Sequence, residues 1–204
     1  MKASRIYFFG IVLVIILILV YTFADTGVND AYEREISQFR TDKHEYFKSS
    51  ADSPIKNKAQ FSQLDYFPPD QHYRIMATLQ PVTDTARLKV RTTDGKQTLL
   101  TRYAYATFAL EGREHRLLLL KSADEENDRL FLPFTDATNG FDTYGGGRYL
   151  DLAYKPGDKQ LMIDFNLAYN PFCAYNDDYS CPIPPKENAL DIPIKAGEKN
   201  YVKP

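Results

Sequence analysis

The sequence lacks several features that would name a function class. It has no tryptophan, only two cysteines and three histidines in 204 residues. Two cysteines with the scattered His44, His72 and His115 do not give the closely spaced ligands of a zinc site. The formal net charge is -2 and no basic run occurs, which argues against a nucleic-acid-binding protein. Walker and Rossmann glycine patterns are also absent, so we predict no nucleic-acid partner, no cofactor and no metal.

The N-terminus carries a long uncharged run. Lys2 and Arg5 precede the apolar residues 6–24, which as a helix span about 28 Å, the thickness of a membrane core. We therefore expect a cytoplasmic stub, residues 1–5, and a transmembrane anchor, residues 6–24. The positive charges indicate a single-pass protein of the cell inner membrane whose C-terminal domain is periplasmic or extracellular. The alternative is a cleaved signal peptide that ends at Ala24.

A helical segment is predicted to follow the anchor, over residues 25–52. Gly27 and Asn29 are expected to end the membrane span, and the apolar spacing then predicts an amphipathic helix over residues 30–48. Ser53-Pro54 resembles an N-cap and a first helical residue, and so predicts a further short helix.

The remainder, residues 53–204, is rich in short alternating segments. Tyrosine and phenylalanine are abundant, at 15 and 13 residues, and favour β-structure. The expected strands cover residues 73–79, 87–91, 98–110, 115–121, 129–134, 148–154, 160–165 and 190–195. The predicted fold is therefore mainly β, an antiparallel sandwich or partly closed barrel, with an N-terminal transmembrane helix and an amphipathic helix.

Two of these strands carry specific burial predictions. Alternation along residues 98–110 places one set of side chains on a common face: Leu100, Ala104, Ala106, Phe108 and Leu110. The opposite face is expected to carry Leu99, Tyr103 and Tyr105. In the next strand, residues 117–120 are four consecutive leucines, and a run without alternation predicts burial on both faces.

The stretch from residue 139 to residue 188 is the most distinctive part of the chain. It holds a triple-glycine turn at residues 145–147, both cysteines and several prolines. The glycines are expected to provide a positive φ or a close backbone approach. The alternative is a nest of backbone N–H groups that binds an anion beside Arg148.

Motifs in this half of the chain resemble the bacterial family called "domain of unknown function 1684". The resemblance covers roughly residues 30–200, and the anchor resembles membrane-tethered forms of the family. It implies a domain boundary and a set of suspect residues, but no activity. The motifs are Phe141-Asp142-Thr143-Tyr144-Gly145-Gly146-Gly147-Arg148-Tyr149-Leu150, Asp164-Phe165-Asn166, Asn170-Pro171-Phe172-Cys173-Ala174-Tyr175, Cys181-Pro182, Pro185-Lys186-Glu187-Asn188 and Ala196-Gly197-Glu198.

Polar and aromatic side chains in these motifs are the candidate binding residues. Arg148 can grip a carboxylate or phosphate through paired hydrogen bonds, or it can pair inside the fold with Asp151, Asp164 or Glu198. Asn and Asp side chains also hold irregular loops by local hydrogen bonds, without any ligand. The candidates are Tyr144, Arg148, Asp164, Asn166, Asn170, Tyr175 and Glu198.

Cys173 and Cys181 are close in sequence, and an exported domain permits a disulfide. The alternatives are two buried free thiols, or a metal-binding or reactive thiol. The sequence therefore predicts a disulfide without excluding the reduced pair.

No nucleophile–base or metal constellation can be recognised, while Tyr, Asn, Asp and Arg cluster in the second half of the chain. We therefore favour a non-catalytic module that binds a small polar ligand or an envelope protein. The competing hypothesis is a hydrolase acting on an envelope or glycan substrate, with Asp164 assisted by Arg148 or Cys173. A third is a structural partner of another membrane protein, through residues 30–48.

Overall fold

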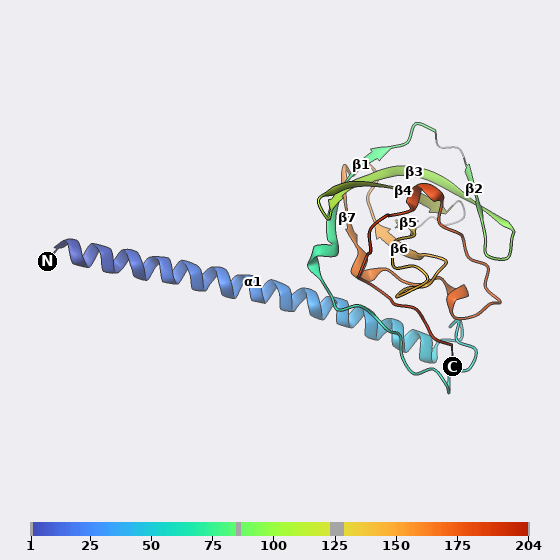
Figure 1. Cartoon of the computed structure of the whole chain (residues 1–204), viewed down its shortest axis with the longest axis horizontal. Coiled ribbons are helices and arrows are strands. Elements are labelled where there is room, and N and C mark those ends of the chain that lie inside the picture. Colours follow the sequence, from blue (N-terminus) through green and yellow to red (C-terminus); the bar gives the residue numbers. More distant parts are fainter. Residues whose placement is uncertain (1, 85–86, 123–128, 204) are drawn as a thin grey trace. The chain divides into compact units, whose positions relative to one another are not determined.

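The structure is a computed structural model that describes residues 2–84, 87–122 and 129–203 (Figure 1). Side chains of the long helix are described only for residues 11–15 and from residue 30 onward, and that of residue 122 is not described. The chain divides into two units, residues 1–41 and residues 42–204. Each is described by itself.

The N-terminal helix is longer than expected. α1 (Lys2–Ser49) is continuous, so the predicted break at Gly27 and Asn29 is wrong. A single glycine costs a helix only about 1 kcal/mol, and no proline interrupts the run. In the part of the chain whose side chains are described, no helix is both long and apolar enough to cross a membrane. Most of the predicted anchor, residues 6–24, lies outside that part.

The short helix predicted after Ser53 does not form, and residues 51–60 are turns and bends. Ser53 instead caps the C-terminal end of α1: its hydroxyl donates to the carbonyl oxygen of Phe47 at 2.6 Å. Lys58 similarly donates to the carbonyl of Ser49 at 3.4 Å. Both side chains satisfy carbonyls that the last helical turn leaves without an intrahelical donor. The Ser-Pro pair thus ends one helix rather than starting another.

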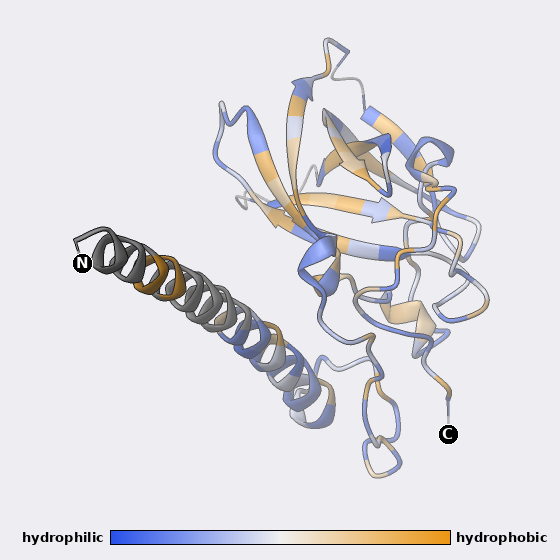
Figure 2. Cartoon of the chain, turned by 60° about the vertical axis from the view of Figure 1, so that its left-hand side comes forward, coloured by the Kyte–Doolittle hydropathy of each residue, from blue (hydrophilic) through white to orange (hydrophobic). Residues whose placement is uncertain are grey.

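In the described residues of the β-domain, the strands form one seven-stranded antiparallel sheet that is nearly closed into a barrel (Figure 1). Its hydrogen-bonded order is β6-β5-β4-β3-β1-β7, and β2 pairs with β3 beside β1. Apolar residues are concentrated in the strands (Figure 2). The strands are β1 (Arg74–Pro81), β2 (Arg87–Arg91), β3 (Gln97–Leu110), β4 (Arg113–Ser122), β5 (Arg129–Phe134), β6 (Arg148–Ala153) and β7 (Gln160–Asp164). The same part of the chain also contains the short 3-10 turns η1 (Gln71–Tyr73), η2 (Phe165–Leu167), η3 (Phe172–Ala174) and η4 (Lys186–Asn188).

Seven of the predicted strands are confirmed to within about two residues at either end, and the strand predicted over residues 190–195 is wrong. That segment does alternate, with Ile192 and Ile194 buried between exposed neighbours. Its backbone does not pair with a neighbouring strand in a ladder. The N–H of Ile194, for example, donates to the Asp136 carboxylate at 3.1 Å. Alternating burial therefore does not by itself make a strand; a partner strand is also needed.

The face assignment in β3 is wrong in two respects, and the first is Tyr103, which was expected on the opposite face but packs against the main core. Ala106, Phe108 and Leu110 belong to the main core, but Leu100 packs in a separate cluster with Leu118 and Leu120 on the other side of the sheet. The register with β4 shifts between Arg102 and Ala104. One extra residue in a strand moves every later side chain to the opposite face. The four leucines of β4 are buried on both faces, as predicted.

A side chain replaces part of the β4–β5 ladder. The two strands pair at Leu120 and Phe131, and Asn188 of η4 lies beside them with no exposed surface. Its amide oxygen accepts from the N–H of Leu118 at 2.7 Å, and its amide nitrogen donates to the carbonyls of Leu118 at 2.9 Å and Pro133 at 2.8 Å. The side chain thus satisfies three buried backbone groups.

Replacing Asn188 with alanine is expected to destabilise the domain by about 3 kcal/mol or more, because each orphaned buried group costs on the order of 1 kcal/mol or above. Urea denaturation followed by circular dichroism measures this change. The exposed Asn200→Ala is the matched control and is expected to stay within about 0.5 kcal/mol of the parent. Equal effects for the two variants would show that the bridge contributes nothing.

Candidate functional site

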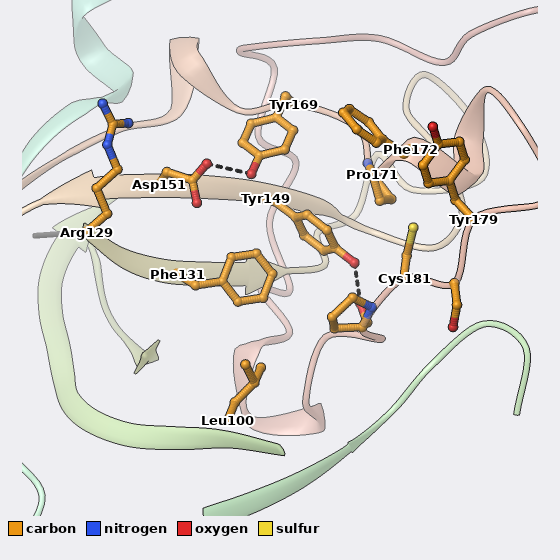
Figure 3. A pocket seen from close by; sticks show the side chains of 12 residues that line it. Leu100, Arg129, Phe131, Tyr149, Asp151, Tyr169, Pro171, Phe172, Tyr179 and Cys181 are labelled. Atoms are coloured by element: carbon orange, nitrogen blue, oxygen red, sulfur yellow. Dashed lines mark hydrogen bonds between the residues drawn. The ribbon is translucent and has the colours of Figure 1, made fainter. Parts of the chain in front are cut away.

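A pocket of about 420 Å³ opens beside β5 and β6 (Figure 3). Its floor is the outer face of these two strands, which turn their other face to the main core. Its cover is the irregular segment of residues 169–182. The lining consists of Leu100, Arg129, Phe131, Tyr149, Asp151, Tyr169, Pro171, Phe172, Tyr179, Ser180, Cys181 and Pro182.

Aromatic rings form most of the wall and hold one another edge to face. Phe131 and Tyr149 have ring centroids 4.7 Å apart, and Phe172 and Tyr179 lie 5.2 Å apart. Tyr169 joins floor and cover, since Tyr149 and Tyr169 exchange backbone hydrogen bonds of 2.9 and 3.0 Å. Such perpendicular contacts are favourable and fix the rings. The wall is therefore an ordered aromatic surface.

The polar groups of the pocket lie at two places. At one end, the hydroxyl of Tyr169 donates to Asp151 at 2.7 Å, near the exposed Arg129 (Figure 3). At the other, the hydroxyl of Tyr149 donates to the carbonyl of Pro182. Burial raises the pKa of both tyrosines, and for Tyr169 the Asp151 carboxylate adds to the effect. Both hydroxyls are thus neutral donors, and Arg129 is the cation of the lining.

The two cysteines lie together at the covered edge of this pocket. Both are buried free thiols in one cluster with Tyr149. The backbone N–H of Cys173 donates to the sulfur of Cys181 at 3.1 Å. The predicted disulfide therefore has its two partners adjacent, in the reduced state.

The two thiols differ in acidity. A hydrogen bond from the Cys181 thiol lowers the pKa of Cys173 to about 6 against the opposing effect of burial, and the hydroxyls of Tyr144 and Thr93 act in the same direction. The same contact, with burial, raises the pKa of Cys181. Tyr144 lies 3.8 Å from the Cys173 sulfur, and burial followed by that contact raises its pKa to about 12. Cys173 is the acidic member of the pair.

Arg148 has no exposed surface and makes an internal network. It pairs with Asp136 at 2.8 Å and also donates to the carbonyls of Ile194, Ala196 and Glu198. Its carboxylate partner is thus Asp136 and not Asp151, Asp164 or Glu198. Phe134 and Arg148 are opposite one another in the β5–β6 pair, so a carboxylate just past Phe134 was the sequence signal to search for.

The triple-glycine turn stands directly before Arg148, and close packing explains one of its members. Gly147 has a φ of 92°, and a Cβ there would lie 2.6 Å from the carbonyl oxygen of Phe134. The expected positive φ and close backbone approach are both present at Gly147.

Glu198 is a second buried charge, 1% exposed. It receives the Lys43 ammonium at 2.6 Å, the N–H of Asn170 at 3.2 Å and the hydroxyl of Tyr175. Asn170 also donates to the carbonyl of Lys199 at 2.7 Å. Three of the predicted candidates therefore meet here, and they fasten α1 at Lys43 to the C-terminal segment.

Asp164 and Asn166 come together at a third place. The Asp164 carboxylate accepts from the N–H of Asn166 at 2.9 Å and lies 3.9 Å from Arg74. The Asn166 amide bonds both the N–H and the carbonyl of Asp70, at 2.9 and 2.7 Å. The pair holds the chain before β1.

The seven predicted candidates thus do not form one site but are divided among several places, and none of them lines the pocket at β5 and β6. Sequence reasoning missed the residues that do, chiefly Arg129, Phe131, Tyr149 and Tyr169. Alternation in residues 129–134 and 148–154 marks one face as polar and aromatic, which was the available signal. Among the described residues, no group of three or more His, Cys, Asp or Glu side chains can hold a metal.

Removing the buried guanidinium by Arg148→Ala is expected to destabilise the domain by about 3 to 5 kcal/mol, because it leaves Asp136 charged and unpaired. Arg148→Lys should recover little, since an ammonium cannot bridge one carboxylate and three carbonyls. Chemical denaturation of both variants measures this. Arg113, which pairs with Asp191 at the surface, is the control, and its alanine variant should lose at most about 1 kcal/mol. An Arg148→Ala protein as stable as that control would contradict the structural role.

Comparisons with known proteins agree with the motifs in the second half of the chain. Residues 59–199 match the family described as "Protein of unknown function (DUF1684)". A solution NMR structure of an uncharacterized protein from Haloarcula marismortui is similar over 85% of this chain and 96% of that one, with 35% identity and a TM-score of 0.67. The search of curated proteins found no match. The chain belongs to the DUF1684 family.

Proposed function

We propose that this protein is a binding module for an amphipathic small molecule, held in the pocket at β5 and β6. The observation that carries the proposal is the aromatic lining with one cation, Arg129, at its rim. The volume of about 420 Å³ falls in the usual range of ligand sites, and concave apolar sites with few polar groups are the common form of such sites.

The lining determines the chemistry of the ligand. The rings of Phe131, Tyr149 and Phe172 offer apolar contact for a planar or aliphatic body, which buried aromatic area stabilises. The polar end of the ligand is expected to be anionic, because Asp151 is already engaged by Tyr169 while Arg129 is exposed at the same end of the pocket. A guanidinium binds carboxylate and phosphate through paired hydrogen bonds.

The alternative function, a hydrolase using Asp164 with Arg148 or Cys173, has less support. Asp164 is bonded to Asn166 and lies beside Arg74, and Arg148 is committed to Asp136 and three carbonyls. A catalytic group needs an unengaged reactive atom that a substrate can reach. The aromatic pocket therefore favours binding over hydrolysis.

The binding proposal predicts a preference for anionic aromatic probes. In nuclear magnetic resonance titrations, 2-naphthoate is expected to bind about five- to tenfold more tightly than the neutral 2-naphthamide, the worth of one charge-assisted contact. The amide signals of residues 169–182 should shift with saturation. Arg129→Gln should remove the preference, and Arg113→Gln, an exposed change elsewhere, should keep it. Equal affinity of both probes for the parent, or no saturable shift in that segment, would refute the proposed site.

We further propose membrane attachment through residues 6–24. The support is the uncharged run itself and the described turn inside it, where Ile11, Leu13, Val14 and Ile15 are 51 to 61% exposed. Successive residues cover all sides of a helix, so this turn is apolar all round. A helix of that kind needs apolar surroundings. Positively charged residues beside a membrane span stay on the cytoplasmic side, so Lys2 and Arg5 place the N-terminus there and the pocket domain on the outer side.

Attachment is tested by placing two arginines in that turn, Leu13→Arg with Ile15→Arg. Each is expected to cost about 2.5 to 3.5 kcal/mol of insertion free energy. The doubly substituted protein should leave the membrane pellet after an alkaline carbonate wash, whereas the parent should stay. Ser37→Arg with Thr41→Arg adds the same charge at exposed helix positions and should behave like the parent. A parent protein found in the wash would overturn the attachment.

A further inference from the structure

We propose that Cys173 and Cys181 are a redox-active pair that reacts with small hydroperoxides, with Cys173 as the attacking thiolate and Cys181 as the resolving thiol. The proposal goes beyond ligand binding and does not depend on it. The two residues are the whole cysteine content of the chain, and both are reduced.

Proximity is the first support. The sulfur of Cys181 accepts from the backbone N–H of Cys173 at 3.1 Å, so it lies within a few bond lengths of the Cys173 side chain. A disulfide requires Cβ atoms about 4 Å apart, and segments joined this closely need little backbone movement. Both cysteines sit in irregular chain, η3 and the segment before Pro182, and not in paired strands.

The surroundings of the Cys173 sulfur are the second support. The hydroxyl of Tyr144 lies 3.8 Å from it, and the Cys181 thiol and the Thr93 hydroxyl also face it. Three donors stabilise a thiolate over a thiol, and the resulting lower pKa of Cys173 makes it the more nucleophilic sulfur at neutral pH. Thr93 also accepts from the N–H of Cys181 at 3.1 Å, so it fixes both partners.

Access is the third support. Cys181 lines the pocket (Figure 3), and Cys173 and Cys181 keep 7% and 6% of their surfaces exposed. Cys173 does not itself line the pocket, but it packs beside Cys181. Hydrogen peroxide is small enough to enter the pocket as far as Cys181, whereas a protein disulfide is too large to do so. The burial therefore selects small peroxides as the oxidant.

The reaction balances with the peroxide as the sole oxidant. The Cys173 thiolate attacks one peroxide oxygen, the O–O bond breaks, and the other oxygen leaves as hydroxide or alkoxide and takes a proton from water. The Cys173 sulfenic acid is then attacked by the Cys181 sulfur, the S–O bond breaks, and the departing oxygen leaves as water with the Cys181 proton. Two thiols and one hydroperoxide thus give one disulfide, one alcohol or water, and one water.

The test uses the full-length protein in detergent, reduced and then treated with one equivalent of hydrogen peroxide. Intact mass should fall by about 2 Da and return with dithiothreitol. Cys181→Ser should stop at a sulfenic acid that dimedone traps on Cys173, and Cys173→Ser should react about tenfold more slowly with no dimedone adduct. No mass loss in the parent, or equal reactivity of the two serine variants, would refute the assignment.

A variant that keeps both thiols covers the case in which a serine variant does not fold. Tyr144→Phe removes one donor from the Cys173 sulfur and is expected to slow peroxide consumption about threefold. Tyr179→Phe, at another ring of the pocket, is the matched control and should react like the parent. A Tyr144→Phe rate equal to that of the control would count against a stabilised thiolate at Cys173.

Discussion

The fully buried guanidinium of Arg148 is the interaction on which the rest of the domain depends. It stands at the start of β6, and through Asp136 and three backbone carbonyls it fixes residues 194–198, a segment that has no ladder of its own. That segment in turn presents Glu198 to Lys43, Asn170 and Tyr175. The cover of the pocket and the loop of Cys173 are thereby anchored through a charge network that begins well away from them. A buried guanidinium that lost its carboxylate partner would strongly destabilise the folded domain, so Arg148 and Asp136 depend on each other.

Side-chain amides in this fold form hydrogen bonds to backbone groups that a further strand would otherwise satisfy. Asn188 completes the backbone pairing of β4 and β5, Asn166 pairs with both backbone groups of Asp70, and Asn139 donates to the carbonyl of Tyr144. A chain with long irregular segments around a sheet must satisfy its buried N–H and C=O groups individually. This accounts for the polar residues of the family motifs by their contacts inside the domain, and it shifts attention from those motifs to the pocket.

Strand positions could be predicted from sequence because period-two alternation is local, and residues 87–91 and 129–134 were predicted with the observed bounds. The shift of register beside Tyr103 could not, because a bulge is set by what the partner strand requires. The partner of Arg148 was missed for a similar reason: a carboxylate just past Phe134 becomes a signal only once residues 129–134 and 148–153 are known to pair, and a single sequence does not show that pairing. The seven candidate residues were read from their chemistry alone, and chemistry does not say whether an asparagine faces a ligand or a backbone carbonyl.

The pocket lies where it does because the two faces of β5 and β6 are covered to different extents. Their inward residues, such as Leu130, Leu132 and Leu150, are packed by the main core. Of their outward residues, Phe131 packs partly against the cluster of Leu100, and Tyr149 packs with irregular chain that carries both cysteines. Irregular chain has its own polar backbone to satisfy and cannot fill the space as a second sheet would. Incomplete covering leaves aromatic surface at a concave site, where an apolar ligand gains most from burial. The same covering segment carries both cysteines, so the chemistry of the thiols and the shape of the pocket share one piece of chain.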